Sequence, residues 1–156
     1  MNIFFLDRDP ATCASMHCDK HVVKMILESA QLLSTAMREF GDNNDQLYKA
    51  THKNHPSAVW VRQSSEHYNY VLELFRELCA EYTSRYGKIH ASDRLVSLLI
   101  HGQSLIPSNG WVDPPQCMPD DCKQDDVVEA YRKYYKEHKR HFATWRTIEP
   151  DWWVDI

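Results

Sequence analysis

A narrow polar strip on an otherwise apolar helix is the arrangement in this sequence best suited to chemistry. Residues 19–40 contain no proline or glycine, and at about 100° per residue six polar side chains fall on one strip: His21, Lys24, Glu28, Gln31, Thr35 and Arg38. Most of the remaining circumference is apolar, so the helix should lie inside the domain with its strip facing a cleft or another element. A buried lysine and glutamate are costly unless they are paired or used. The strip therefore indicates either an active-site wall or a solvated edge that carries a Lys24–Glu28 pair.

Histidine and cysteine spacings offer two weaker hypotheses, both of a metal site. His17 and His21 are four residues apart, which can place two imidazoles on one zinc ion, but the sequence fixes no third ligand. Histidines at a helix edge more often hydrogen-bond to their surroundings. Cys117 and Cys122 have four residues between them in a proline-rich loop, a spacing that only weakly suggests a metal. The odd number of cysteines, five, indicates reduced thiols rather than disulfides.

The C-terminal segment, residues 127–156, combines basic and aromatic side chains although the whole chain has a net charge of −4. Within it, residues 127–146 hold six lysines and arginines against two acids. The net charge argues against a general nucleic-acid binder, yet a local basic face can neutralise phosphates while flat rings stack on bases. The candidates for these contacts are Arg132, Lys133, Lys136, Arg140, Trp152 and Trp153. For the two tryptophans, packing in the core is an equally good interpretation.

Helix boundaries and apolar periodicity predict one all-α domain spanning residues 1–156. Three or four helices are expected, with long irregular connections and an extended N-terminal arm. Residues 2–6 are interpreted as this arm or as a short strand. The expected helices cover residues 19–40, residues 56–86 up to a stop at Gly87, a short stretch after Ser92, and a last segment from Asp125 or Asp126 through Phe142.

The composition is that of an ordinary globular protein, with 43% hydrophobic and 26% charged residues. No stretch approaches the roughly 18 apolar residues of a membrane span. The first residues, MNIFFLDRDP, lack the basic n-region of a signal peptide. We therefore expect no membrane association and a cytoplasmic protein, which would be in the host cytoplasm if a phage encodes it.

Four segments, taken in order, resemble the pyrimidine-dimer DNA glycosylase family, also called phage-type endonuclease V. They are MNIFFLDRDP at the start, HVVKMILES in the polar-strip helix, KNHPSAVW before the second long helix, and YRKYYKEHKR in the C-terminal segment. The resemblance implies that Glu28 takes the place of the catalytic glutamate. It also implies that Asn54 and His55, in the asparagine–histidine–proline turn, contact DNA together with the C-terminal segment.

In this family the nucleophile is the α-amine of the residue exposed after methionine removal. Here residue 2 is asparagine, which normally blocks that removal, so the amine would belong to Met1. Three outcomes stay open: the geometry adapts to Met1, Lys24 substitutes as nucleophile, or the chain keeps the fold and changes its chemistry. An α-amine has an ordinary pKa of about 8, against about 10.4 for lysine, so more of it is neutral and nucleophilic at neutral pH.

The implied reaction begins with attack of the amine on C1′ of a damaged nucleotide exposed by bending or flipping. The base leaves, and the resulting imine permits strand cleavage by β-elimination. Glu28 would stabilise the cationic sugar and move protons, with Lys24 or His21 orienting it. Lys20 and Arg38 could hold phosphates beside the site. This chemistry uses no metal and no cofactor.

The sequence thus favours a DNA glycosylase with abasic-site lyase activity, whose partner is damaged or modified duplex DNA. One alternative is a nucleic-acid-binding or nucleotide-modifying relative without amine chemistry. Another, from a different class, is a zinc enzyme built on His17 and His21.

Overall fold

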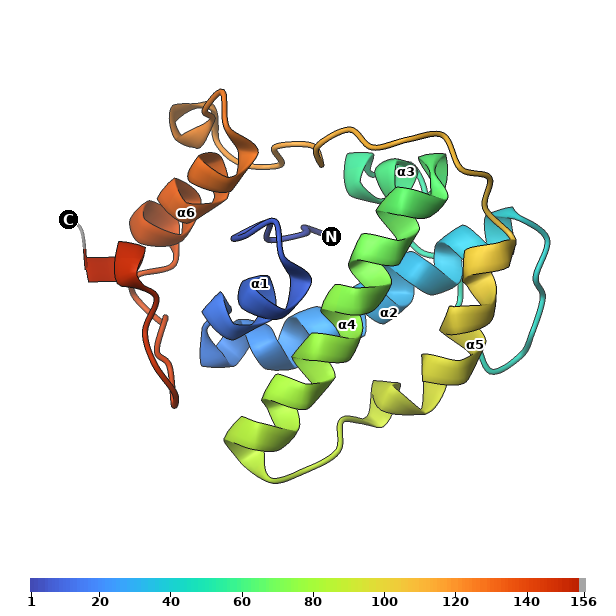
Figure 1. The fold of residues 1–156 in the computed structure, drawn as a ribbon, viewed down its shortest axis with the longest axis horizontal. Helices are drawn as coiled ribbons and strands as arrows, with labels where there is room; N and C mark the ends of the chain where they lie inside the picture. Colours follow the sequence, from blue (N-terminus) through green and yellow to red (C-terminus); the bar gives the residue numbers. More distant parts are fainter. Residues whose placement is uncertain (155–156) are drawn as a thin grey trace.

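Helices make up the regular structure of the chain, in a computed structural model that describes residues 1–154. The α-helices are α1 (Pro10–Met16), α2 (Asp19–Glu39), α3 (Pro56–Gln63), α4 (Ser65–Tyr86), α5 (Val96–His101) and α6 (Val127–His138) (Figure 1). Short 3-10 helices are η1 (Ala91–Leu95), η2 (Gly102–Ser104), η3 (Asp120–Cys122) and η4 (Asp151–Val154). Residues 1–154 contain no strand, so the all-α prediction is confirmed, although six α-helices exceed the three or four expected. None of the helices in this range is both long and apolar enough to cross a membrane.

α2 packs against α3 and α4 and carries the polar strip (Figure 1). It begins and ends within one residue of its predicted limits, and Gly41, with a φ of 94°, turns the chain away behind it. His21 and Thr35 of the strip are buried. Arg38 is partly buried, because its guanidinium donates to backbone carbonyls of the following loop. Much of the strip therefore faces other segments of the chain rather than solvent.

The helix predicted from residue 56 to residue 86 is in fact two helices, α3 and α4, because the chain breaks at Ser64. Ser64 is extended, with a φ of −156° and a ψ of 143°, and its hydroxyl accepts the Glu66 N–H as the N-cap of α4. The same hydroxyl accepts the Asn109 N–H from the long loop that crosses this point. The predicted stop at Gly87 is present, with a φ of 67°.

The N-terminal segment runs between α4 and α6 (Figure 1), and its apolar side chains are buried. The ring of Phe5 lies 5.1 Å from that of Tyr70 on α4, and the ring of Phe4 lies 5.5 Å from that of Tyr135 on α6, measured between centroids. A hydrogen bond from Leu6 N–H to Phe4 O makes a tight turn, and the segment forms no strand. The segment is therefore a buried link between the two helices.

α6 begins at its predicted cap, Asp126, whose carboxylate accepts the N–H of the second helical residue. It ends at His138 and does not continue to Phe142 as expected. One cluster of buried apolar residues extends from Ile3 to Trp153, through all the larger helices.

Candidate active site

The amino group of Met1 lies against the carboxylate of Glu28, which projects from the middle of α2. The nitrogen is 3.5 Å from Glu28 Oε1, and the exposed fractions of the two side chains are only 5% and 15%. Met1 reaches this position because the residues that follow it are packed between α4 and α6. An amine and a carboxylate withdrawn from water in this way are stable together only as a pair.

Lys24 lies on the other side of the same carboxylate. Its Nζ is 3.7 Å from Glu28 Oε2, and 65% of its side chain is exposed. The helix-spaced Lys24–Glu28 pair expected for a solvated edge is thus present as well. Glu28 consequently lies between two amines, that of the partly buried Met1 and that of the exposed Lys24, and these are the two candidate nucleophiles that the sequence left open.

One buried oxygen atom at this site, Oε2 of Glu28, has no hydrogen-bond partner in the described part of the chain. Oδ1 of Asn2, the residue after Met1, is likewise without one. Buried polar atoms in folded proteins are nearly always satisfied, and exceptions concentrate where a ligand or water completes the site. Oε2 of Glu28, which lies toward Lys24, can therefore accept a further hydrogen bond.

His55, in the asparagine–histidine–proline turn, is close enough to the N-terminus to respond to its charge. Burial lowers the pKa of His55, and the positive charge of the N-terminal amine lowers it further. The ring also caps α3, with Nδ1 accepting the Ser57 N–H at 3.0 Å. In the neutral ring the proton is then on Nε2. The neighbouring Asn54 is exposed.

His21 lies under the N-terminal segment, where it makes contacts other than the one predicted with Glu28. Its ring stacks on Phe4 with centroids 4.4 Å apart, and its Nδ1 is 2.6 Å from the Tyr135 hydroxyl. Burial, followed by the positive charges around it, lowers the pKa of His21 to about 3. The ring is therefore neutral and holds Phe4, and through Phe4 the segment that carries the amine.

The zinc hypothesis for His17 and His21 does not fit this geometry. The Nδ1 of His17 lies 2.8 Å from the Cys13 carbonyl and that of His21 lies 2.6 Å from the Tyr135 hydroxyl, so only Nε2 of each ring remains as a possible ligand atom. Neither histidine belongs to a group of three or more potential metal ligands within residues 1–154. His17 is completely buried and its pKa is lowered to about 4, chiefly by that burial. Both rings are core histidines.

The two cations predicted to hold phosphates beside the site have different surroundings. Lys20 is exposed, with its Nζ 4.8 Å from the centroid of the Phe142 ring, so it can reach a ligand. Arg38 donates to the carbonyls of Tyr48 and Leu47 at 2.8 and 3.0 Å. Most of the hydrogen-bonding capacity of Arg38 is thus used to hold the loop after α2.

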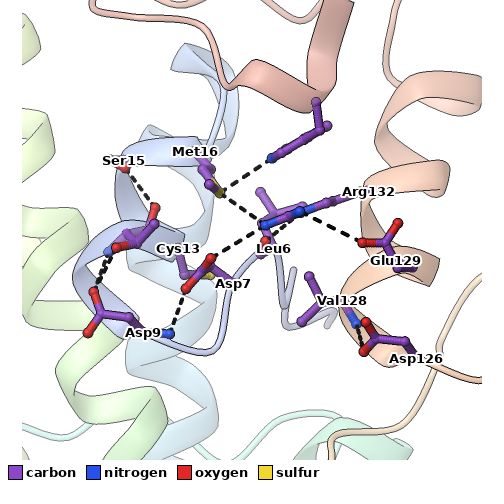
Figure 2. Close-up of polar contacts among 12 residues, drawn as sticks. Leu6, Asp7, Asp9, Cys13, Ser15, Met16, Asp126, Val128, Glu129 and Arg132 are labelled. Carbon is purple, nitrogen blue, oxygen red and sulfur yellow. Dashed lines mark hydrogen bonds and ion pairs between the residues drawn. The ribbon is translucent and has the colours of Figure 1, made fainter. Parts of the chain in front are cut away.

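The guanidinium of Arg132, on α6, also contacts other residues of the chain, as Figure 2 shows. It donates to Leu6 O at 2.9 Å and lies 3.4 Å from the Asp7 carboxylate, 3.8 Å from that of Glu129 and 3.9 Å from the Met16 sulfur. These contacts join α6 to the N-terminal segment. Arg132 therefore positions that segment, and fewer of its N–H groups are left for a phosphate than the sequence suggested.

The other predicted phosphate contacts lie at spacings of three and four residues: Lys133, Lys136 and Arg140. Lys133 and Lys136 therefore lie on one side of α6, and Arg140 lies in the turn after the helix ends. Lys133 donates to the Asp121 carbonyl, and the Arg140 guanidinium lies 4.3 Å from the centroid of the Trp153 ring. Arg140 is exposed and the two lysines are partly exposed, so their charges remain available at the surface.

Trp152 and Trp153 pack in the interior, with exposed fractions of 9% and 7%. The indole N–H of Trp152 points to the Met16 sulfur at 3.4 Å, and the ring of Trp153 lies 4.7 Å from that of Trp145. Of the two interpretations left open by the sequence, this geometry favours packing in the core. Stacking on bases would require the end of the chain to open.

Two residues of the site were not identified from the sequence. Asn2 could have been, because it follows Met1, whose amine the family resemblance offers as the nucleophile. Tyr135 carried no such signal. Its hydroxyl meets His21 only because α6 folds back onto the start of α2.

The terminal amine lies against a carboxylate of a long helix, with a histidine–proline turn nearby, in a chain whose regular structure over residues 1–154 is all helical. Residues 1–95 match the family model described as pyrimidine dimer DNA glycosylase, and they include the N-terminal segment, α2 and the turn before α3. The chain therefore belongs to the pyrimidine dimer DNA glycosylase family. Membership implies DNA glycosylase activity with damaged DNA as the partner. No curated protein and no solved structure is significantly similar to the chain.

Proposed function

We propose that this glycosylase also acts as an abasic-site lyase, with the Met1 α-amine as nucleophile and Glu28 as the catalytic carboxylate. The observation that carries the proposal is the distance of 3.5 Å between the Met1 nitrogen and Glu28 Oε1, at a site largely withdrawn from water. Membership of the glycosylase family supports the class of reaction. Retention of Met1, which Asn2 favours, is compatible with this proposal, because the amine of residue 1 lies beside the carboxylate.

In the first step a bond forms from the amine nitrogen to C1′, and the bond from C1′ to the damaged base breaks. The base leaves with the electron pair and takes up a proton. The nitrogen loses a proton, for which Glu28 Oε1 is a suitable acceptor. Opening of the sugar ring gives an imine. Loss of a C2′ proton then breaks the C3′–O bond, the electron pair leaves with the phosphate, and the strand is cut.

The surrounding residues have separate roles in this proposal. The negative charge of Glu28 opposes the positive charge that develops on the sugar. Lys24, 3.7 Å from the second carboxylate oxygen, keeps that carboxylate oriented. His55, in its neutral form, can donate its Nε2–H to an oxygen of the substrate, and the exposed Asn54 beside it can contact the strand. His21 acts indirectly, by supporting Phe4.

Borohydride trapping on DNA that contains an abasic site tests the nucleophile. The unmodified chain should form a covalent adduct, and acetylating or extending the N-terminus should abolish it. Glu28→Gln should lower turnover by about 10²- to 10⁴-fold, the usual contribution of a general acid–base group, with little change in DNA affinity. Glu39→Gln is the matched control, because Glu39 is an exposed glutamate at the end of the same helix.

The alternatives predict different results in the same assay. An adduct that survives N-terminal blocking but is lost in Lys24→Ala would make Lys24 the nucleophile. No adduct under any condition, with DNA still bound, would favour the second candidate function, a nucleic-acid-binding relative without amine chemistry. The exposed Arg140 and the partly exposed Lys133 and Lys136 are the observation that keeps this candidate open.

A further inference from the structure

Four different metal-binding side chains meet where η3 approaches the C-terminal end of α6. Asp121 and Cys122 come from η3, and Glu137 and His138 come from the last turn of α6. One ligand atom from each residue lies within 4.8 Å of the ligand atoms of the other three. These residues form the α6-end cluster. The proposed glycosylase reaction uses none of them.

The distances in the α6-end cluster are close to those of a tetrahedral zinc site. Zinc holds sulfur at about 2.3 Å and imidazole nitrogen or carboxylate oxygen at about 2.0 Å, so two ligands are about 3.3–3.5 Å apart. Cys122 Sγ and Glu137 Oε2 already have this spacing, at 3.4 Å. The widest separation in the cluster, 4.8 Å, has to shorten by about 1.5 Å. Asp121 and Glu137 are exposed, so rotations about their side-chain bonds can supply that movement.

The charges of the α6-end cluster favour a cation. Cys122 Sγ lies 3.4 Å from Glu137 Oε2, and a carboxylate oxygen of Asp121 lies within 4.8 Å of the ligand atoms of both residues. Glu137 lies at the C-terminal end of α6, where the helix dipole disfavours a negative charge. Lys133 offsets part of this charge, with its Nζ 4.0 Å from Glu137 Oε1. A divalent ion would replace the thiol proton and offset the charge of one of the two carboxylates.

The types of donor select the metal. Magnesium and calcium prefer oxygen ligands alone, whereas a thiolate combined with an imidazole suits zinc. Cys117, the other cysteine of the preceding loop, is not part of the cluster, and its sulfur lies 3.7 Å from the Ser57 hydroxyl instead. The ligands that accompany Cys122 therefore come from α6 and not from Cys117, contrary to what the spacing of the two cysteines suggested.

We infer that the α6-end cluster binds a zinc ion through four protein ligands. Sites closed by four protein ligands are structural rather than catalytic. The ion ties the end of the long loop before α6 to the helix that carries Lys133 and Lys136. It thereby fixes the surface on which these cations lie without taking part in the chemistry at Met1.

Metal titration of the full chain, freed of metal by a chelator and kept reduced, tests this inference. Calorimetry with Zn²⁺ should give one ion per chain. Co²⁺, which takes the same ligands and absorbs light, should give the intense near-ultraviolet charge-transfer band of a cobalt–thiolate bond. Cys122→Ser should remove the band and weaken zinc binding by more than about tenfold. Cys117→Ser, the matched control from the same loop, should leave both unchanged.

Thermal unfolding gives a second readout. Zinc at a hundredfold excess over its Kd should raise the Tm of the unmodified chain and of Cys117→Ser by roughly 5–11 °C, and that of Cys122→Ser by much less. If circular dichroism shows that Cys122→Ser is not folded, His138→Gln takes its place and should also weaken the cobalt complex.

Three results would overturn the inference. They are the absence of a charge-transfer band in the unmodified chain, a band that survives removal of the Cys122 sulfur, and an equal loss of zinc affinity in Cys122→Ser and Cys117→Ser. These measurements use no DNA. Their failure would leave the amine chemistry untouched, and failure of borohydride trapping would leave the zinc site untouched.

Discussion

Arg85, near the C-terminal end of α4, is expected to contribute far more stability than Arg76, the other arginine of that helix. The Arg85 side chain is completely buried. Its guanidinium donates to four partners: Ser15 O at 3.0 Å, His17 O at 2.7 Å, Asp19 Oδ1 at 3.1 Å and Glu81 Oε1 at 2.8 Å. It thus holds the end of α1 and the start of α2 against α4.

Arg85→Met removes the charge while keeping most of the apolar volume. Removing one partner of a buried ion pair costs about 3–5 kcal/mol, because the other charge is left buried without compensation. Glu81 is 25% exposed and regains part of its hydration, so the lower end of that range is expected. For a chain of this length each kcal/mol lowers the Tm by roughly 2–4 °C, so the Tm should fall by about 6–12 °C.

Thermal and urea unfolding, followed by circular dichroism, measure this difference. Arg76→Met is the control: its side chain is 47% exposed and its guanidinium lies 3.5 Å from Glu73. An exposed pair of this kind contributes about 1 kcal/mol or less. The reasoning would be refuted if the two variants unfolded at the same temperature and urea concentration.

Two further predictions concern pH and salt. Acid should destabilise the fold, because burial lowers the pKa of His17 to about 4 and that of His21 to about 3. Below about pH 6.5 these two histidines take up protons in the unfolded chain but not in the folded chain. The free energy of unfolding should therefore fall as the pH drops toward 4, by up to roughly 1.4 kcal/mol per pH unit for each histidine. Equal urea midpoints at pH 7 and pH 5 would contradict this. Salt dependence of DNA binding should come from three cations: Lys133, Lys136 and Arg140. Neutralising them together should reduce the slope of log affinity against log salt by up to about three units, and an unchanged slope in a salt titration would show that these cations make no phosphate contact.

Local features of the fold could be predicted because they depend on neighbouring residues. The polar strip followed from helical periodicity, and it identified Glu28 as the carboxylate to examine. The stop at Gly87 and the cap at Asp126 followed from conformational preferences that act within a few residues. The family resemblance had the same basis, since short motifs around Glu28 and His55 carried it.

Features that depend on distant partners could not be predicted. The break at Ser64 is held by the Asn109 N–H, which is far away in the sequence. Arg132 looked like a phosphate ligand, but its guanidinium is occupied by Leu6 and Asp7. Periodicity and charge indicate which side chains share a face, but they do not indicate which segment covers that face.

The candidate site shows most clearly the difference between features set by neighbouring residues and features set by distant ones. The sequence alone determined that Glu28 and Lys24 project from one side of a long helix, since a spacing of four residues makes them neighbours on any α-helix. Only the tertiary structure decided that the Met1 nitrogen lies 3.5 Å from that carboxylate. No local preference brings the two together. Burial of Phe4 and Phe5 between α4 and α6 does so, because the hydrophobic effect depends on the whole assembled core.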